Sequence, residues 1–404
     1  MERLFTIQNM LIEHFQQSTF YPRLCFNGIT YDNRITGLVG ARGIGKTTLL
    51  LQQAITKGAA QKKALYLSAD NYYLLDTPLI ELVDRLYTET EVRFLCVDEI
   101  QKYPNWNQEL KNIYDMYPDF RVLFSGSSMI DLIRAKYDLS RRVTMHHLHG
   151  LSFREYLEFT HQITIPQYTL SELLQNPETI TNTLNTSNIL KLFNDYLRIG
   201  YYPFFSALHL DIEKFQAIEN TVQKALYEDI ASLHSLKTST LSVIEKLYKY
   251  VVGSLPGEVS AYKLASALGK DFESISDYLR LLEQAGLIRF LFTDKSGKAQ
   301  LRNPTKMYPD NTNLIFAACL PQSPDVIQGK VRETFVVNQL KNSHHEVYYS
   351  DLGDFKVQDY LFEVGGKNKS STQLQGHPNG YVLADGITHG HKNKIPLYLL
   401  GFLY

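Results

Sequence analysis

The feature that most constrains this chain is a glycine-rich segment near its amino end. Residues 40–47 read Gly-Ala-Arg-Gly-Ile-Gly-Lys-Thr and match the pattern G-x-x-x-x-G-K-[ST]. Residues 35–39 are mostly apolar and predict a strand that leads into the segment, and residues 46–57 predict a helix that leads out and ends at Gly58. A strand, a glycine-rich turn and a helix in this order predict a phosphate-binding loop.

The residue types of this loop fit the chemistry of a polyphosphate. Glycines let successive backbone N–H groups face the phosphate oxygens, and the helix N-terminus adds partial positive charge. We expect Lys46 to reach the β- and γ-phosphates and the Thr47 hydroxyl to ligate Mg²⁺. The predicted nucleotide-binding residues are Gly40, Ala41, Arg42, Gly43, Ile44, Gly45, Lys46, Thr47 and Thr48.

Two acidic residues follow a second apolar segment. Residues 93–97 predict a buried parallel strand, after which come Asp98 and Glu99. We expect Asp98 to hold Mg²⁺ through water and Glu99 to orient and polarise the attacking water. The sequence therefore supplies a carboxylate pair opposite the loop.

A third apolar segment, residues 121–125, ends in small hydroxyl side chains. In ATPases with a catalytic glutamate after the aspartate, a polar residue on the intervening strand contacts the γ-phosphate or the lytic water. Ser125 is the candidate for this role and Ser127 is the alternative. A simple serine N-cap for a helix at residues 129–136 is the competing structural interpretation.

The order of these segments predicts an α/β fold with a doubly wound parallel sheet. The expected strands are residues 35–39, 64–68, 93–97, 121–125 and 143–148, and helices at 78–88 and 107–116 connect some of them. Ligand-binding loops of such a sheet gather at the carboxyl ends of its strands, where the three motifs lie.

Composition excludes several classes of protein. The 404 residues carry 41 basic and 42 acidic side chains, so a polybasic nucleic-acid binder and an acidic disordered tail are both excluded. The three cysteines lie far apart, which argues against a disulfide framework or a zinc site. The sequence has neither a signal-peptide pattern nor an apolar stretch near the roughly 20 residues that span a membrane, so we expect a cytoplasmic protein without membrane contact.

These motifs resemble an AAA-like ATPase family in which an amino-terminal ATPase is fused to a conserved domain of unknown function. The family is common in bacteria and archaea, and the resemblance covers nearly the whole chain. The segments that carry it are residues 40–50, 97–101, 124–128, 151–157, 196–203 and 329–337. The resemblance implies a P-loop NTPase fold, with ATP as ligand and Mg²⁺ as cofactor.

An arginine precedes the fifth strand in that family, and Arg142 stands at the corresponding place here. Arg141 replaces the glycine that the family has before it. The resemblance implies that Arg142 stabilises transition-state charge, either in its own chain or on the ATP of a neighbouring subunit, whereas a solvated basic turn is the alternative. A role in trans requires more than one copy of the chain, which leaves a homo-oligomer open.

The resemblance and the local patterns divide the chain into four regions. They are an AAA-like P-loop ATPase domain at 1–150, a helical region at 151–240, a winged-helix-like domain at 241–300 and a degenerate restriction-endonuclease-like α/β domain at 301–404. Ser152 and Glu155 have the spacing of a capping box at the start of the helical region. Residues 175–188 predict a loop, and the apolar residues 395–404 predict a buried strand.

Residues 259–268 and 271–284 predict two helices in a helix-turn-helix arrangement, followed by a strand at 287–292. DNA binding would be the usual inference, but residues 270–284 hold four acidic and two basic side chains. A helix with this excess of negative charge is repelled by phosphates. We therefore favour a protein partner for the carboxyl-terminal half over DNA.

The last 75 residues resemble a restriction-endonuclease-like domain, with Glu333 on a helix and Asp351, Asp354, Glu363 and Lys367 near the following strands. An active nuclease of this type has its lysine two residues after the glutamate, so that both side chains share one face of a strand. Lys367 follows Glu363 by four residues instead. We therefore expect a degenerate domain without nuclease activity.

The sequence thus predicts a Mg²⁺-dependent ATPase that acts as a nucleotide-driven switch for its winged-helix and nuclease-like module. Two alternatives remain open at this point. One is an ATP-dependent DNA-processing nuclease, and the other is a scaffold that binds ATP with negligible turnover.

Overall fold

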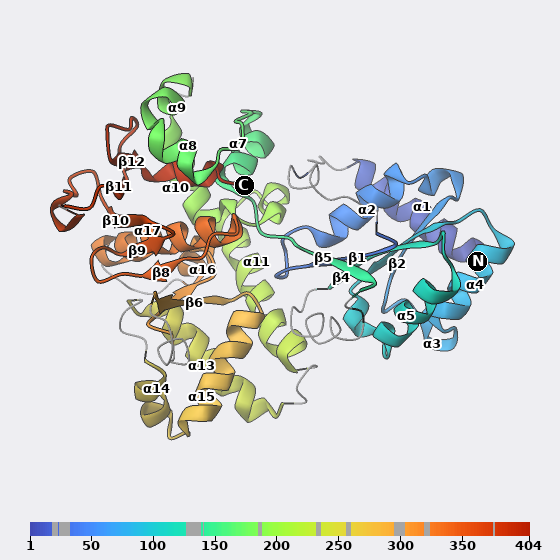
Figure 1. Cartoon of the computed structure of the whole chain (residues 1–404). Helices are drawn as coiled ribbons and strands as arrows, with labels where there is room; N and C mark the ends of the chain where they lie inside the picture. Colours follow the sequence, from blue (N-terminus) through green and yellow to red (C-terminus); the bar gives the residue numbers. More distant parts are fainter. Residues whose placement is uncertain are drawn as a thin grey trace. The chain divides into compact units, whose positions relative to one another are not determined.

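The computed structural model describes residues 1–17, 23, 33–126, 139, 141–184, 188–231, 236–255, 260–294, 304–318, 324–374 and 376–404. The chain forms two compact units, Met1–His149 and Gly150–Tyr404, each with its own sheet (Figure 1). Within the described residues, no helix is long and apolar enough to cross a membrane.

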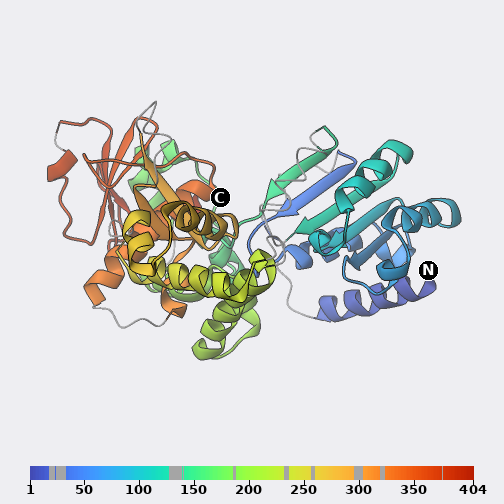
Figure 2. The same ribbon diagram turned by 90° about the horizontal axis from the view of Figure 1, so that it is seen from below.

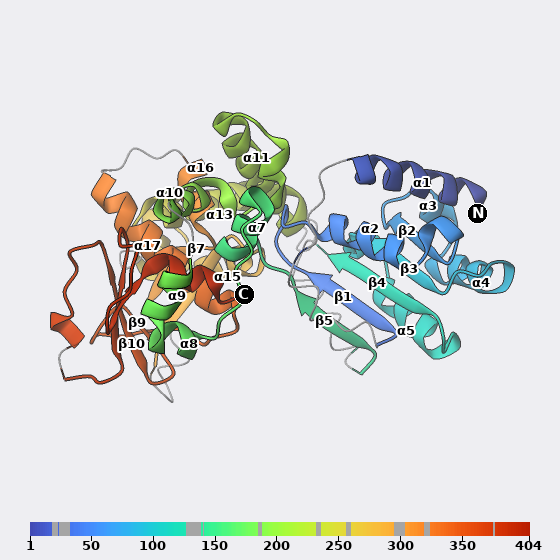
Figure 3. The same cartoon turned by 90° about the horizontal axis from the view of Figure 1, so that it is seen from above.

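The first unit is built on a five-stranded parallel sheet. Its strands are β1 (Ile35–Val39), β2 (Ala64–Ser68), β3 (Phe94–Asp98), β4 (Arg121–Gly126) and β5 (Val143–His147). Their order in the sheet is β2-β3-β4-β1-β5, and every pairing is parallel (Figure 3). This arrangement confirms the predicted α/β fold, and the strand bounds differ from the predicted ones by one residue at most.

Helices cover both faces of this sheet, which is why its central strands are almost continuously apolar. The helices are α1 (Glu2–Gln17), α2 (Lys46–Thr56), α3 (Tyr73–Asp76), α4 (Leu79–Glu89) and α5 (Trp106–Met116), with short 3₁₀ turns η2 (Ala59–Gln61) and η3 (Ile100–Lys102). Helix α1 lies on one face and α5 on the other (Figure 2), where the Trp106 ring packs 5.7 Å from the Phe124 ring of β4.

The second unit begins with helices. They are α7 (Phe153–His161), α8 (Leu170–Gln175), α9 (Pro177–Thr183), α10 (Ile189–Asp195), α11 (Asp211–Lys224), α13 (Thr238–Gly253), α14 (Ala261–Leu268) and α15 (Phe272–Gln284). Helices α10 and α11 continue into π-helical turns, η4 (Tyr196–Gly200) and η6 (Ala225–Ile230), and a 3₁₀ helix η5 (Pro203–Ala207) lies between them. The predicted capping box is confirmed, because the Ser152 hydroxyl accepts from the Glu155 N–H and the Glu155 carboxylate accepts from the Ser152 N–H.

A seven-stranded mixed sheet completes the second unit. Its strands are β6 (Ile288–Thr293), β7 (Lys306–Pro309), β8 (Tyr348–Tyr349), β9 (Phe355–Val357), β10 (Tyr360–Gly365), β11 (Gly380–Ala384) and β12 (Lys394–Pro396), in the order β12-β11-β10-β9-β8-β6-β7. Helices α16 (Thr312–Ala317) and α17 (Pro324–Asn342) and the 3₁₀ turns η8 (Thr372–Leu374) and η9 (Leu397–Phe402) accompany it. The boundary expected at residues 300 and 301 falls between β6 and β7, which pair with each other in this sheet.

Two local predictions for this unit are wrong. The loop expected at residues 175–188 includes helix α9 instead, whose Pro177 occupies the first turn and whose Ile180 and Thr181 are buried. Residues 395–403 are buried as expected, but only Ile395 and Pro396 among them belong to a strand, and the 3₁₀ helix η9 follows. Phe402 of η9 stacks 6.0 Å from Phe153 of α7, and this packing in an aromatic core favours the helical turn over an extended strand.

Candidate nucleotide-binding site

The phosphate-binding loop requires glycine at three positions. Gly43 and Gly45 have φ angles of 80° and 95°, in the left-handed region that side chains disfavour. At Gly40 a Cβ atom would lie 2.3 Å from the Leu148 carbonyl oxygen and 2.5 Å from Ile44 Cδ1. The backbone therefore passes too close to the end of β5 for any other residue at this position.

Lys46 is the first residue of α2 and is buried under the loop. Its Nζ donates to the carbonyl oxygens of Gly40 at 2.8 Å and Ala41 at 2.7 Å. The ammonium group is therefore held at the concave side of the loop, where N–H groups and a helix N-terminus can receive phosphate oxygens.

The Asp98 carboxylate accepts hydrogen bonds from hydroxyl groups on α2, β2 and β4. Thr47 Oγ1 donates to Asp98 Oδ2 at 2.6 Å, and the Tyr66 hydroxyl donates to the same oxygen at 3.1 Å. Ser125 Oγ donates to Asp98 Oδ1. Burial raises the pKa of Tyr66 far above its ordinary value and the neighbouring Asp98 adds to the shift, so Tyr66 stays a hydrogen-bond donor.

The sheet order explains how Ser125 reaches this cluster. Strand β4 lies between β1, which carries the phosphate-binding loop, and β3, which carries the two acids. Ser125 pairs with Leu38 near the end of β1, and its Oγ accepts from the Glu99 N–H at 3.1 Å. The structure thus places Ser125 against Asp98 and the backbone of Glu99. The alternative, Ser127, and the helix expected at 129–136 lie outside the described residues.

Glu99 adopts a left-handed backbone conformation with φ of 52°. Its Oε2 lies 2.7 Å from Lys102 Nζ, and the same Nζ lies 2.7 Å from Asp70 Oδ2. The Ser68 hydroxyl in turn donates to Asp70 Oδ1 at 2.5 Å. Sequence reasoning missed Asp70 and Lys102, although the spacing of three residues between Glu99 and Lys102 was a usable signal.

Arg23 is a second residue that sequence reasoning missed. Its guanidinium is buried and donates to the Ile44 carbonyl of the loop at 3.0 Å and to the His149 carbonyl at 2.9 Å. Arg23 precedes the first strand and belongs to no motif, so no local signal could have identified it.

Arg142 lies at the amino ends of the strands, whereas the phosphate-binding loop lies at their carboxyl ends. Val143 pairs with Ile35 at the start of β1, whereas the loop follows the end of β1. Arg142 forms two hydrogen bonds with Asp115 of α5, at 3.0 and 3.1 Å. The structure therefore does not bring Arg142 together with residues 40–48 of the same chain, and a role in trans stays a prediction.

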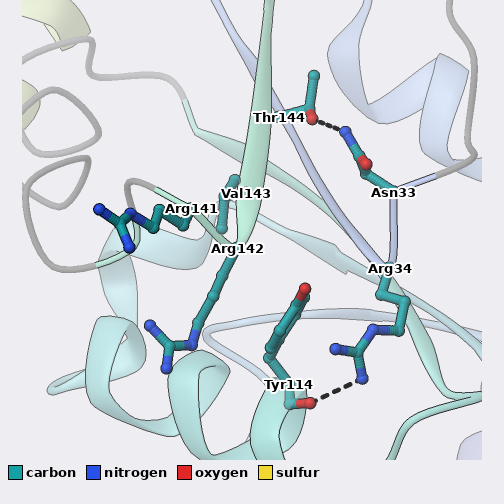
Figure 4. A pocket seen from close by; sticks show the side chains of 7 residues that line it. All are labelled: Asn33, Arg34, Tyr114, Arg141, Arg142, Val143 and Thr144. Carbon is teal, nitrogen blue, oxygen red and sulfur yellow. Dashed lines mark hydrogen bonds between the residues drawn. The ribbon is translucent and has the colours of Figure 1, made fainter.

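A small pocket of about 290 Å³ lies beside Arg142. The Arg34 guanidinium stacks 3.6 Å from the centre of the Tyr114 ring and donates to the Tyr114 carbonyl at 2.8 Å, whereas Arg141 points away from the ring (Figure 4). The charged groups that line the pocket diverge, so they do not converge on one position for a ligand.

The acidic residues predicted in the second unit have mostly intramolecular partners. Glu363 is buried and forms an ion pair with Lys369, whereas Lys367 offers its carbonyl to Lys394. Glu363 thus pairs with Lys369, six residues after it, and the structure describes no contact between Glu363 and Lys367. Asp354 accepts from the backbone N–H of residue 364 at 2.8 Å.

Glu333 accepts from the Tyr308 hydroxyl at 2.8 Å, and the Tyr349 hydroxyl donates to Asp351. Among the residues that the structure describes, no group of three or more His, Cys, Asp or Glu side chains is arranged to hold a metal ion.

Known families and proteins match large parts of this chain. A family model described as "AAA domain" matches residues 32–157, and one described as "Domain of unknown function (DUF8612)" matches residues 190–318. The chain is 30% identical over 391 residues to Uncharacterized protein MJ1637 of Methanocaldococcus jannaschii. This alignment covers 89% of this chain and 81% of the relative.

A second protein of the same organism, Uncharacterized protein MJ1544, is 23% identical over 356 residues, covering 85% of this chain and 74% of the relative. Among solved structures, the replication initiator DnaA bound to AMPPCP and single-stranded DNA aligns at 16% identity over 67% of this chain and 91% of that chain. Its TM-score is 0.27, so this likeness adds no support. The match to MJ1637 and the AAA model together show that the chain belongs to a family of AAA-type P-loop ATPases with a carboxyl-terminal domain of unknown function.

Proposed function

We propose that the first unit binds ATP with Mg²⁺ and hydrolyses it. The observation that carries this proposal is the contact between Thr47 and Asp98, whose oxygens lie 2.6 Å apart at the start of α2 and the end of β3. Mg²⁺ prefers oxygen ligands, and in P-loop NTPases it is held by a serine or threonine hydroxyl of the loop and by an aspartate. The donor set therefore fits the ion, with Thr47 as a direct ligand and Asp98 as its carboxylate partner.

The residues of the chain have distinct tasks in this reaction. Bound MgATP supplies the phosphoanhydride bond and the positive charge that polarises it. Lys46 exchanges its two carbonyl acceptors for phosphate oxygens, and Ser125 and Tyr66 hold Asp98 in its orientation. Glu99 orients the attacking water and accepts its proton.

Substitutions of Lys46 and Glu99 test the two halves of this proposal. Lys46→Ala should abolish binding of a fluorescent ATP analogue, because the buried cation of the loop is lost. Glu99→Gln should bind the analogue as tightly as the wild type but release almost no phosphate. Lys57→Ala, which removes a lysine at the other end of α2, is the matched control and should behave as the wild type.

The outcomes separate this function from its alternatives. Unchanged nucleotide binding by Lys46→Ala would contradict the proposed site. Equal, near-background phosphate release by the wild type and Glu99→Gln would favour an ATP-binding scaffold. Phosphate release should also be measured with and without double-stranded DNA. A difference would indicate a DNA-dependent activity, which the ATPase proposal does not require.

We also propose that nucleotide binding is transmitted to the second unit as a switch. Two contacts of the phosphate-binding loop support this idea. Arg23 joins the Ile44 carbonyl to that of His149, which is the last residue of the first unit. The Leu148 carbonyl lies against Gly40, and the Leu148 N–H donates to the Val39 carbonyl at 2.8 Å. A shift of the loop would therefore displace the backbone directly before residue 150.

Hydrogen–deuterium exchange tests this coupling. ATP should change the exchange of backbone amides in residues 150–404 of the wild type. Arg23→Met should retain ATP binding but lose most of that change, because the link between the loop and residue 149 is cut. Arg34→Met, which removes an arginine at the amino ends of the strands, should keep the change. An equal response in wild type and Arg23→Met would contradict the proposed route.

A further inference from the structure

A chain of charged side chains leads away from Glu99. The Glu99 carboxylate contacts Lys102, Lys102 contacts Asp70, and Asp70 accepts a hydrogen bond from Ser68. Lys102 lies in the 3₁₀ turn η3 directly after β3, and Asp70 lies two residues after β2. Lys102 thus bridges two carboxylates, that of Glu99, which is the proposed general base, and that of Asp70 in the segment after β2.

The sheet order gives this bridge a direction. Strand β3 has β2 on one side and β4 followed by β1 on the other. The phosphate-binding loop follows β1, whereas the anchor Asp70 follows β2. The bridge therefore draws the Glu99 carboxylate toward β2, on the side of β3 away from the strand that carries the loop.

Only the Glu99 end of this bridge is partly shielded from water. The side chain of Glu99 is 21% exposed, whereas those of Lys102 and Asp70 are 40% and 52% exposed. The hydrogen bond from Lys102 lowers the pKa of Asp70, and the Ser68 hydroxyl adds to this shift. Burial alone would lower the pKa of Lys102, but its hydrogen bond to Asp70 and its ion pair with Glu99 outweigh burial and raise it. Lys102 and Asp70 therefore stay charged at neutral pH.

A carboxylate held in an ion pair must leave its partner before it can turn toward a water at the phosphate-binding loop, so opening the ion pair adds to the free energy of activation. We propose that Lys102, anchored on Asp70, restrains Glu99 and so limits the rate of ATP hydrolysis until this ion pair opens. Lys102 acts through Glu99 and is a positioning residue. This inference rests on the proposed ATPase function, with Glu99 as the base.

Steady-state hydrolysis by variants of the bridge tests the restraint. Lys102→Met removes the cation but keeps an unbranched side chain, so kcat should rise about two- to five-fold, the range expected from a partly exposed ion pair. The KM for ATP should stay the same, because the described partners of Lys102 are Asp70 and Glu99 and not residues 40–48. Lys102→Arg keeps the charge and should restore a rate close to that of the wild type.

Asp70→Asn provides an independent variant that does not touch Glu99 directly. It should also raise kcat, by less than Lys102→Met, and it keeps the test open if that variant folds poorly. Lys57→Met is a control for the loss of one positive charge. An unchanged or lowered kcat in both Lys102→Met and Asp70→Asn would overturn the proposed restraint.

The double variant Lys102→Met with Glu99→Gln separates the two proposals. If the restraint acts through Glu99, this double variant should be as inactive as Glu99→Gln alone. Loss of activity in Glu99→Gln without any gain in Lys102→Met would refute the restraint only. Equal hydrolysis by the wild type and Glu99→Gln would instead refute the proposed role of Glu99 in the reaction.

Discussion

Replacement of Ser125 by alanine tests how the two acids at the end of β3 are held. Ser125 is fully buried, donates to Asp98 Oδ1 and accepts from the Glu99 N–H at 3.1 Å. A hydrogen bond to a charged group contributes roughly 1.5–3 kcal/mol, and a neutral one contributes about 1 kcal/mol. The Glu99 N–H keeps a second acceptor, Asp98 Oδ1 at 3.2 Å. We therefore expect Ser125→Ala to lower the free energy of unfolding of the first unit by about 2 kcal/mol.

The chain offers a specific probe for this measurement. Its single tryptophan, Trp106, is buried in the first unit and packs against Phe124, the neighbour of Ser125 on β4. Tryptophan fluorescence during urea denaturation therefore reports on this unit alone.

Thr36→Val is the matched control for Ser125→Ala. Thr36 lies on the adjacent strand β1 and is equally buried, but its hydroxyl has no hydrogen-bond partner among the described residues. Valine has a similar shape, so the substitution should leave stability unchanged or raise it slightly.

The Ser125→Ala substitution should also slow the reaction. If the lost contacts orient Glu99, the proposed ATPase rate should fall about tenfold or more, because each 1.36 kcal/mol corresponds to about a factor of ten. Binding of the nucleotide should change much less. Equal unfolding curves and equal rates for Ser125→Ala and Thr36→Val would refute the role assigned to this hydroxyl.

Three further substitutions test other parts of the structure. Gly40→Ala should abolish nucleotide binding, measured by fluorescence of an ATP analogue, because the new methyl group meets the Leu148 carbonyl; normal affinity would contradict the close approach of these two backbone segments. Burial lowers the pKa of Lys330 to about 8, so the unfolded chain binds more protons between about pH 8 and 10. Relative to Lys330→Met, the free energy of unfolding of the wild type should therefore rise by up to about 1.4 kcal/mol per pH unit in this range, measured by denaturation followed by circular dichroism. Parallel pH profiles of the two proteins would contradict this prediction. Arg142→Ala should leave nucleotide binding by an isolated chain unchanged, since Arg142 pairs with Asp115 at the amino ends of the strands, and weaker binding would place it near the ligand.

Local sequence patterns were sufficient for the parts of the site that lie on one continuous segment. The loop at residues 40–47 needs left-handed glycines at fixed positions, and Gly43 and Gly45 have that conformation. The strand before Asp98 and Glu99 is recognisable because a parallel strand covered on both faces must be apolar throughout. These features depend on neighbours in the sequence, so the sequence alone reveals them.

Secondary-structure prediction was wrong where tertiary packing decides the outcome. Helix α9 has many Asn and Thr residues, which are weak helix formers, but it forms because Pro177 starts it and Ile180 packs into the core. The apolar residues at the chain end predict a strand, yet aromatic stacking with Phe153 stabilises a 3₁₀ helix there.

The sequence by itself determined the phosphate-binding loop, the acidic pair and the α/β class, because each follows from local spacing and from burial on both faces of a sheet. Only the tertiary structure decided which distant side chains contact that loop and the neighbouring Asp98. Tyr66, Ser125 and Asp98 meet because β2, β3 and β4 are neighbours in the sheet, and Arg23 reaches both the loop and residue 149 across 126 residues of sequence. Contacts of this kind depend on strand order and chain closure, which no short segment encodes.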